Sequence, residues 1–265
     1  MLERTIRKYR NKFGSARLPR SWRASPLEGR RVYHLAHEIV ALRDGAYEDE
    51  TVRRVACWHG HGCVGFDIGA NIGLFSLGVL AKGACGHIYA LEPNPATFAR
   101  LQCTLEANAL SEFVTAIPAA LADKAGALTF SIHRPELSSG DGFRDTGRVG
   151  PSQSIIVPSL TLDAIIEAAA LKRVDWLKID TEGAEALVLA GAPNCLTQMR
   201  PKICFEAHPI NLTAYGVGPS ALFEVFSKNS YRLETVAGRH LNEDGFESTV
   251  NAIAEDNFIA LPMDA

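Results

Sequence analysis

The stretch VGFDIGANIGLFSLGVL (residues 64–80) begins as an apolar run and ends in a helical pattern, with a turn of small residues between them. A continuous apolar run that changes into a helix is typical of one strand–helix unit in a parallel sheet. The turn glycines, Gly69 and Gly73, lie four residues apart, so the turn departs from the G-x-G-x-x-G order of a dinucleotide site. The stretch therefore predicts an open α/β sheet with a ligand other than a dinucleotide beside this turn.

The alternation of strands and helices continues through the rest of the chain. Strands are expected at 63–68, 87–93, 113–121, 174–180, 202–208, 231–237 and 257–262, and helices at 72–82, 94–110, 161–170, 182–191 and 219–230. A hairpin is expected after the third strand, from 127–133 and 153–160. This order predicts one doubly wound, mostly parallel α/β sheet with helices on both faces and an inserted hairpin.

The residues before this sheet have a different pattern. Apolar residues recur at helical spacing between residues 31 and 58. We therefore expect a helical N-terminal extension over 1–58 that packs on the core, and a single catalytic or binding domain over 59–265.

Composition excludes several classes of protein. The net charge is -3 with a pI near 6.2, which gives no sign of a nucleic-acid-binding surface. No apolar run approaches the roughly 20 residues that span a membrane. The six cysteines form no C-x-x-C pair and fall mostly in apolar stretches, which is typical of buried thiols in a reducing compartment. We expect a cytoplasmic protein without a membrane span or a nucleic-acid partner.

The turn after the first sheet strand favours a positively charged ligand group. No Lys or Arg occurs in it, and the carboxylate of Asp67 would repel phosphate and attract an ammonium group. Gly69 is expected to let a ligand approach the backbone, Gly73 to let the next helix pack closely, and Asn71 to donate or accept within the turn.

Glu92 ends the second strand, 92 − 67 = 25 residues after Asp67. An acidic residue at about this interval holds a ribose in Rossmann-like folds, since one carboxylate can accept from both hydroxyls. A ligand with a ribose and an amino-acid end but no phosphate is S-adenosylmethionine rather than NAD. The alternative is that both acids merely lie at wet strand ends, which their joint placement disfavours.

A third group of candidates follows the later strands. Asp180 ends one strand, and alternation places Lys178 on its face; Glu206 and His208 come at the end of the next strand. Asp180, Glu206 and His208 would then converge as a general-base cluster, with Glu206 orienting the imidazole. The alternatives are a divalent-metal site, which we do not favour, and a purely structural role.

The sequence resembles the FkbM-type methyltransferases, which are class I enzymes that use S-adenosylmethionine. The segments that carry the resemblance are FDIGANIG (66–73), LEPNP (91–95), LTLDAI (160–165), VDWLKIDTEGAEALVLAGA (174–192) and RPKICFEAHP (200–209). They keep the family's order and spacing over roughly residues 45 to 262. The sequence departs from the family where WHGHGCV (58–64) replaces a short Pro-Gly turn, away from the expected chemistry.

The resemblance implies a seven-stranded sheet with the last strand antiparallel. It implies a cofactor bound by the loop from Asp67 through Ala70 to Gly73 and by Glu92. By analogy with other class I enzymes, Ala120 and Leu121 border the adenine, and Asp123 is a candidate partner of its amino group. DKAG (123–126) is also a good type I turn, and we favour the turn for Asp123.

The expected activity is O-methylation of a hydroxyl on a sugar, a polyketide or a related natural product. N-methylation of an amine or amide is the alternative reaction, and a non-catalytic cofactor-binding scaffold is the alternative class. The glycine-rich stretch 138–152 is either a lid over a small-molecule or glycan acceptor or a surface loop.

Overall fold

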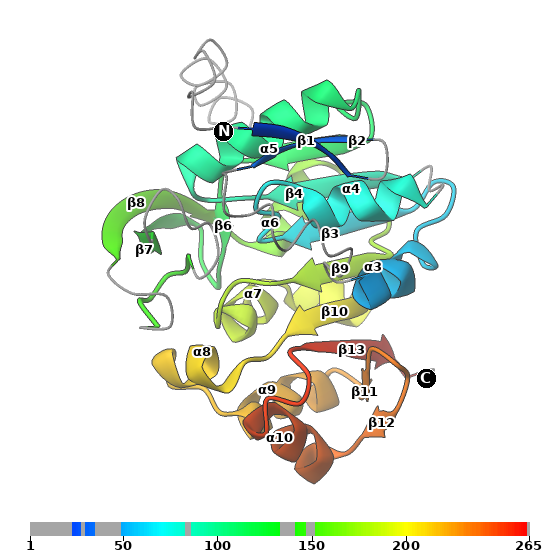
Figure 1. Ribbon diagram of the computed structural model, residues 1–265. Coiled ribbons are helices and arrows are strands. Elements are labelled where there is room, and N and C mark those ends of the chain that lie inside the picture. The colour runs from blue at the N-terminus through cyan, green and yellow to red at the C-terminus, as the bar shows by residue number, and fades with distance from the viewer. Residues whose placement is uncertain are drawn as a thin grey trace.

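The computed structural model describes residues 23–27, 30–34, 49–82, 86–132, 141–146 and 152–263. Its main feature is an eight-stranded sheet with the order β12-β11-β13-β10-β9-β3-β4-β5. The strands are β3 (Val64–Ile68), β4 (His87–Leu91), β5 (Val114–Ile117), β9 (Trp176–Ile179), β10 (Lys202–Glu206), β11 (Tyr231–Thr235), β12 (His240–Leu241) and β13 (Asn257–Pro262). The doubly wound α/β architecture expected from the sequence is therefore confirmed (Figure 1).

The sheet has a parallel half and an antiparallel end. β5, β4, β3, β9 and β10 run parallel, whereas β13 is antiparallel to both β10 and β11. The last strand is antiparallel as expected. The short strand β12 pairs with β11 and adds one strand to the seven that were expected.

Helices cover both faces of the sheet. They are α3 (Asp49–Ala56), α4 (Leu74–Ala81), α5 (Pro95–Ala107), α6 (Leu162–Ala168), α7 (Glu185–Ala190), α8 (Pro209–Ala214), α9 (Pro219–Lys228) and α10 (Glu243–Asn251), with a single π turn η1 (Cys195–Met199). One apolar cluster packs α3, α4 and α5 on the sheet, and a second packs α6, α7, α9 and α10 on the other face. Asn94 caps α5, because its side chain accepts from the Ala96 amide.

A smaller sheet lies beside the large one (Figure 1). It has the order β6-β8-β7, from Ala120–Leu121, Gln153–Leu160 and Gly126–Ile132, and β7 and β8 form the expected hairpin. The strand expected over 113–121 is divided between the two sheets. Pro118 follows β5 and has no N–H to continue its ladder, so the chain leaves the large sheet there and pairs with β8.

The N-terminal extension differs from the expected helix. Residues 30–34 form strand β2 (Arg30–His34), which pairs antiparallel with β1 (Arg23–Leu27), and within the expected helical span only α3 is helical among the described residues. Residues 35–48 of that span lie outside the described residues. β-branched Val32 in a run of long side chains fits a strand as well as a helix, which explains the discrepancy.

In the ranges that the structure describes, no helix has the length and apolar character to cross a bilayer. Cys195 and Cys204 are buried as expected, but Cys57 is exposed and Cys63 and Cys103 are half-buried.

Candidate active site

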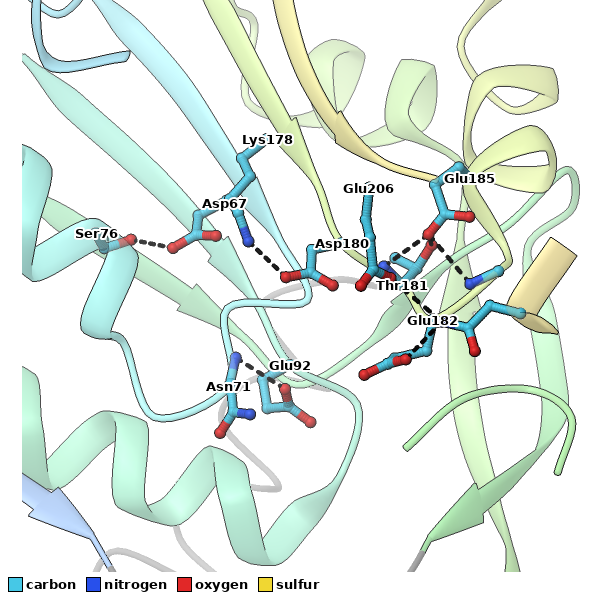
Figure 2. A network of polar contacts seen from close by, with 12 residues as sticks. Asp67, Asn71, Ser76, Glu92, Lys178, Asp180, Thr181, Glu182, Glu185 and Glu206 are labelled. Atoms are coloured by element: carbon cyan, nitrogen blue, oxygen red, sulfur yellow. Dashed lines mark hydrogen bonds and ion pairs between the residues drawn. The ribbon is translucent and has the colours of Figure 1, made fainter. Parts of the chain in front are cut away.

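A cavity opens at the carboxyl ends of the parallel strands, where ligands bind in open α/β sheets. Its wall includes Ile68, Gly69, Asn71, Leu91, Glu92, Pro93, Ala119, Ala120, Leu121, Phe130, Asp141, Phe143, Asp180, Thr181, Glu182 and Glu206. Figure 2 shows the carboxylates of Glu92, Asp180, Glu182 and Glu206 around one central space. Seven of the residues that the sequence singled out therefore share one wall: Gly69, Asn71, Glu92, Ala120, Leu121, Asp180 and Glu206.

The turn after β3 is fastened to the end of β4. The amides of Gly69 and Ala70 both donate to the Leu91 carbonyl, at 3.0 and 2.8 Å, and the Asn71 amide donates to the Glu92 carboxylate at 3.0 Å. These three N–H groups already have acceptors, so they do not form a phosphate cradle of the P-loop kind. The expectation that this turn rejects phosphate has a backbone cause in addition to the charge of Asp67.

Both glycines of the turn are needed for internal packing. Gly69 has φ +84°, and a Cβ at this position would lie 1.8 Å from the Asp180 carbonyl oxygen. Gly73 has φ +88°, and its Cβ would meet Leu101 of α5 at 2.7 Å. The close neighbours are thus the Asp180 backbone just after β9 for Gly69 and a side chain of α5 for Gly73, whereas the sequence suggested a ligand for Gly69 and the following helix for Gly73.

Asp67 lies behind the cavity and does not line it. Its side chain is fully buried and accepts a 2.6 Å hydrogen bond from the Ser76 hydroxyl (Figure 2). Burial raises the pKa of Asp67, while the nearby Lys178 ammonium lowers it. Direct contact between Asp67 and a ligand ammonium, as expected from the sequence, does not fit this placement.

Lys178 connects Asp67 to the cavity. Lys178 lies opposite Asp67 in the β3–β9 register, and its side chain is only 2% exposed. Its ammonium donates to Asp180 at 2.6 Å and lies 4.9 Å from the centre of the Phe75 ring. The expected Lys178–Asp180 pair is present, and it fixes one carboxylate oxygen of Asp180 at the cavity wall.

Glu92 faces the cavity from the end of β4. Its two carboxylate oxygens accept from the amides of Asn71 at 3.0 Å and Asn94 at 2.8 Å. Burial raises the pKa of Glu92 to about 8, although the amide donors and Arg100 act in the opposite direction. A ligand that donates hydrogen bonds to this carboxylate would favour its charged form.

Three more carboxylates face the cavity from the ends of β9 and β10. Asp180, Glu182 and Glu206 line it together, and the Asn211 amide donates to Glu182 at 2.7 Å and to Glu206 at 3.4 Å. Asn211 is fully buried in α8, so it links the two glutamates from behind. The arrangement offers several acceptors for hydroxyl protons.

The turn after β9 is held by a buried glutamate. Glu182 has φ +54° and Gly183 has φ +105°, so two successive residues adopt left-handed conformations. Oε1 of Glu185 accepts from the Thr181 amide, the Thr181 hydroxyl and the Gly183 amide (Figure 2). Burial raises the pKa of Glu185 to about 7. This carboxylate maintains the turn that places Thr181 and Glu182 at the cavity.

Four other sequence candidates are outside the wall. Ala70 and Gly73 support the first turn from behind. Asp123 is exposed between β6 and β7 and pairs with Lys124, and its place in a type I turn stays a prediction. His208 is the N-cap residue just before α8, because β10 ends at Glu206 and strand alternation does not continue to residue 208. The catalytic role of His208 stays a prediction.

Sequence reasoning missed Asp141, Phe143, Thr181 and Glu182 as lining residues. Asp141 and Phe143 belong to the glycine-rich stretch 138–152, which was expected to be either a lid or a surface loop, with no individual residue indicated. Residues 138–140 and 147–151 of that stretch lie outside the described residues. Glu182 was expected as the first residue of the helix over 182–191, but it precedes α7 and faces the cavity.

The described residues contain no group of three His, Cys, Asp or Glu side chains arranged to hold a metal ion. The preference for a metal-free site stays a prediction.

Comparison with known proteins places the chain in a family. Residues 67–233 match the methyltransferase FkbM domain. The chain is 27% identical over 217 residues to "Hexuronic acid methyltransferase AglP" of Haloferax volcanii, covering 82% of this chain and 83% of that protein. It is 35% identical over 142 residues to "Methyltransferase 1" of Beauveria bassiana, covering 47% of this chain and 56% of that protein.

Among solved structures, a SAM-dependent O-methyltransferase from Thermotoga maritima has a TM-score of 0.43 and 13% identity, covering 82% of this chain and 66% of that one. That likeness is too distant to bear on function, whereas the domain match spans well over half of the chain. The chain belongs to the FkbM family of S-adenosylmethionine-dependent methyltransferases.

Proposed function

We propose that this chain transfers a methyl group from S-adenosylmethionine to a hydroxyl of a sugar or related natural product. The observation that carries the proposal is the wall described above. One side offers Glu92 beside apolar groups, and the other offers Asp180 and Glu206. Residues 59–265 would form the methyltransferase domain.

The chemistry of the wall fits the cofactor. Ala120, Leu121 and Phe130 offer an apolar surface for an adenine, and Glu92 lies where the ribose of a Rossmann-like ligand is held. The amides of the first turn are already bonded to β4, so a pyrophosphate would find few donors. The acid that would face the ammonium of the cofactor is not Asp67, because Asp67 is fully buried and does not line the cavity.

The second half of the wall supplies groups for proton removal. The cofactor, when bound, provides an activated methyl group, so the protein has to position the acceptor and take up its proton. Asp180 is held by Lys178, and Glu206 is held by Asn211; either carboxylate would accept the hydroxyl proton. Glu182 and Thr181 would orient the other hydroxyls of the acceptor.

The charge of the wall favours a hydroxyl over a carboxylate as acceptor. Five carboxylates line the cavity, and its described lining includes no Lys, Arg or His. A uronate would be repelled here, whereas neutral hydroxyls would find acceptors. In this respect we expect a different acceptor from the hexuronic acid in the name of the Haloferax volcanii relative.

Two experiments test the proposal. Calorimetry should show binding of S-adenosylmethionine and S-adenosylhomocysteine but not NAD, and the reverse preference would overturn the cofactor assignment. Transfer of labelled methyl groups to a panel of neutral hexosides and matched uronosides should label the neutral sugars. Label that appears only on uronosides, as base-labile methyl esters, would refute hydroxyl methylation.

A further inference from the structure

Residues 141–146 connect the small sheet to the end of α8. Gly142 pairs with Ser131 at the end of β7, with its amide donating at 3.1 Å. The Arg144 amide donates to the Tyr215 hydroxyl at 3.2 Å, and its guanidinium donates to the Ala214 carbonyl at 3.0 Å. The segment is thus fastened to the small sheet and to the end of α8, and two of its residues, Asp141 and Phe143, line the cavity.

Asn94 holds Asp141 in a defined place. The Asn94 side-chain amide donates to Asp141 at 2.8 Å, while its oxygen accepts from the Ala96 amide as the cap of α5. The capping bond determines which end of the Asn94 amide faces Asp141. Asn94 is only 7% exposed, so its orientation is set by the fold rather than by solvent.

The same residue also holds Glu92. The backbone N–H of Asn94 donates to Glu92 at 2.8 Å, and both carboxylates line the cavity. One asparagine therefore places two carboxylates side by side, and the charge of Asp141 is one reason for the raised pKa of Glu92. Two adjacent carboxylates repel each other unless hydrogen-bond donors lie between or beside them.

We infer that Asp141 and Glu92 together form a site for the vicinal diol of the cofactor ribose, with Asn94 as the positioning residue for both. Each carboxylate would accept from one hydroxyl, whereas a single glutamate would have to accept from both while also bonding two amides. The inference rests on the proposed use of S-adenosylmethionine. It adds a residue from the inserted segment to the cofactor site.

The test measures affinity for S-adenosylhomocysteine and for its 2′-deoxy and 3′-deoxy analogues. We expect Asp141→Asn to lower the affinity for S-adenosylhomocysteine about 10-fold or more, since a hydrogen bond to a charged group is lost. Asp145→Asn is the matched control, because Asp145 lies in the same segment, bonds Ser152 and is absent from the cavity wall. It should bind like the wild type.

The analogues separate contact from folding. Asp141→Asn and the wild type should bind the analogue that lacks the hydroxyl facing residue 141 with the same affinity. For the other analogue, Asp141→Asn should still bind more weakly than the wild type. Equal losses for all three ligands would overturn the inference. Wild-type protein alone provides a second measurement: if removal of either hydroxyl leaves its affinity unchanged, the diol site is refuted without reference to any variant.

The pH dependence of binding tests whether the Asp141 carboxylate lies beside Glu92. Among the charged groups near Glu92, Asp141 raises its pKa and Arg100 lowers it. Removing the Asp141 charge should therefore lower the pKa of Glu92. We expect affinity for the cofactor to rise with pH until Glu92 is ionised, so in Asp141→Asn the affinity should level off at a lower pH than in the wild type. If Glu92→Gln weakens binding and Asp141→Asn changes neither affinity nor this pH, the inference fails while the proposed function stands. If the wild type binds no adenosyl ligand, the proposed function itself fails.

Discussion

Two turns border the cavity, and a buried glutamate holds each of them. The turn after β3 contains Asn71 at φ +50°, and its amide donates to Glu92. The turn after β9 contains Glu182 at φ +54°, and its neighbouring amides donate to Glu185. Burial raises the pKa of both glutamates, to about 8 and about 7.

The two glutamates differ in what else they can reach. Glu92 lines the cavity, whereas Glu185 is 1% exposed and faces the turn from behind. A raised pKa and several backbone bonds therefore do not by themselves identify a ligand-binding carboxylate; access to the cavity does. Glu92 should act on the ligand directly, and Glu185 only through the turn.

The largest effect should come from the residue that begins the second turn. Asp180→Asn removes a candidate base from the wall, and kcat should fall about 10²–10⁴-fold. Affinity for S-adenosylhomocysteine should change much less, and exposed Asp244→Asn on α10 serves as the control. Normal turnover of Asp180→Asn would transfer the base role to Glu206. Calorimetry on the same samples shows whether the loss of the Lys178 partner disturbs the cavity.

The next largest effect, on cofactor affinity, should come from the glutamate that holds the first turn. Glu92→Gln keeps the size of the side chain but loses the charge and one of its two oxygen acceptors. Affinity for S-adenosylhomocysteine should fall about 10- to 100-fold, as for the loss of hydrogen bonds to a charged group. Isothermal calorimetry measures this change, and an unchanged affinity would remove Glu92 from the ligand site.

The sequence predicted the first turn better than the second. The interval between Asp67 and Glu92 and the strand–helix pattern located the sheet and the cavity edge at which Glu92 lies, because these depend on local periodicity. Glu185 lies four residues beyond Thr181, and only the three-dimensional turn shows that its carboxylate folds back onto residues 181–183.

Long-range features were beyond the reach of the sequence pattern. Position 69 has no room for a Cβ because the Asp180 backbone, 111 positions later in the chain, lies beside it. Asp141 lies in a segment without regular pattern, and its contact with Asn94 depends on how that segment connects the small sheet to the end of α8. Helix α10 was missed because its two acids and a glycine at the start look like a loop.

The pH dependence of binding should show the raised pKa of Glu92. Ribose hydroxyls that donate to Glu92 favour its charged form, so binding below pH 8 has to release a proton. Affinity should therefore rise with pH, by at most about tenfold per unit, and level off near pH 8. Calorimetry in two buffers with different heats of ionisation counts the released proton. In Glu92→Gln this rise should disappear, and its persistence there would assign it to another group.

The smallest effect on binding should come from Glu185→Gln, which tests the contrast between the two glutamates. The glutamine keeps one oxygen at the position of Oε1, where all three donors of the turn meet, so affinity for S-adenosylhomocysteine should stay within a few-fold of the wild type.

Stability should respond to pH in a way that binding does not. Wild-type Glu185 keeps a proton in the folded state that the unfolded chain releases above about pH 4.5, so its ionisation lowers stability as pH rises through about 7. The thermal midpoint of Glu185→Gln should therefore increase relative to that of the wild type between pH 5 and pH 8. Glu185→Leu, which leaves the Thr181 and Gly183 amides without this acceptor, should lose about 1–3 kcal/mol for each buried N–H. If Glu185→Gln instead lost cofactor affinity as severely as Glu92→Gln, access to the cavity would not be what distinguishes the two carboxylates.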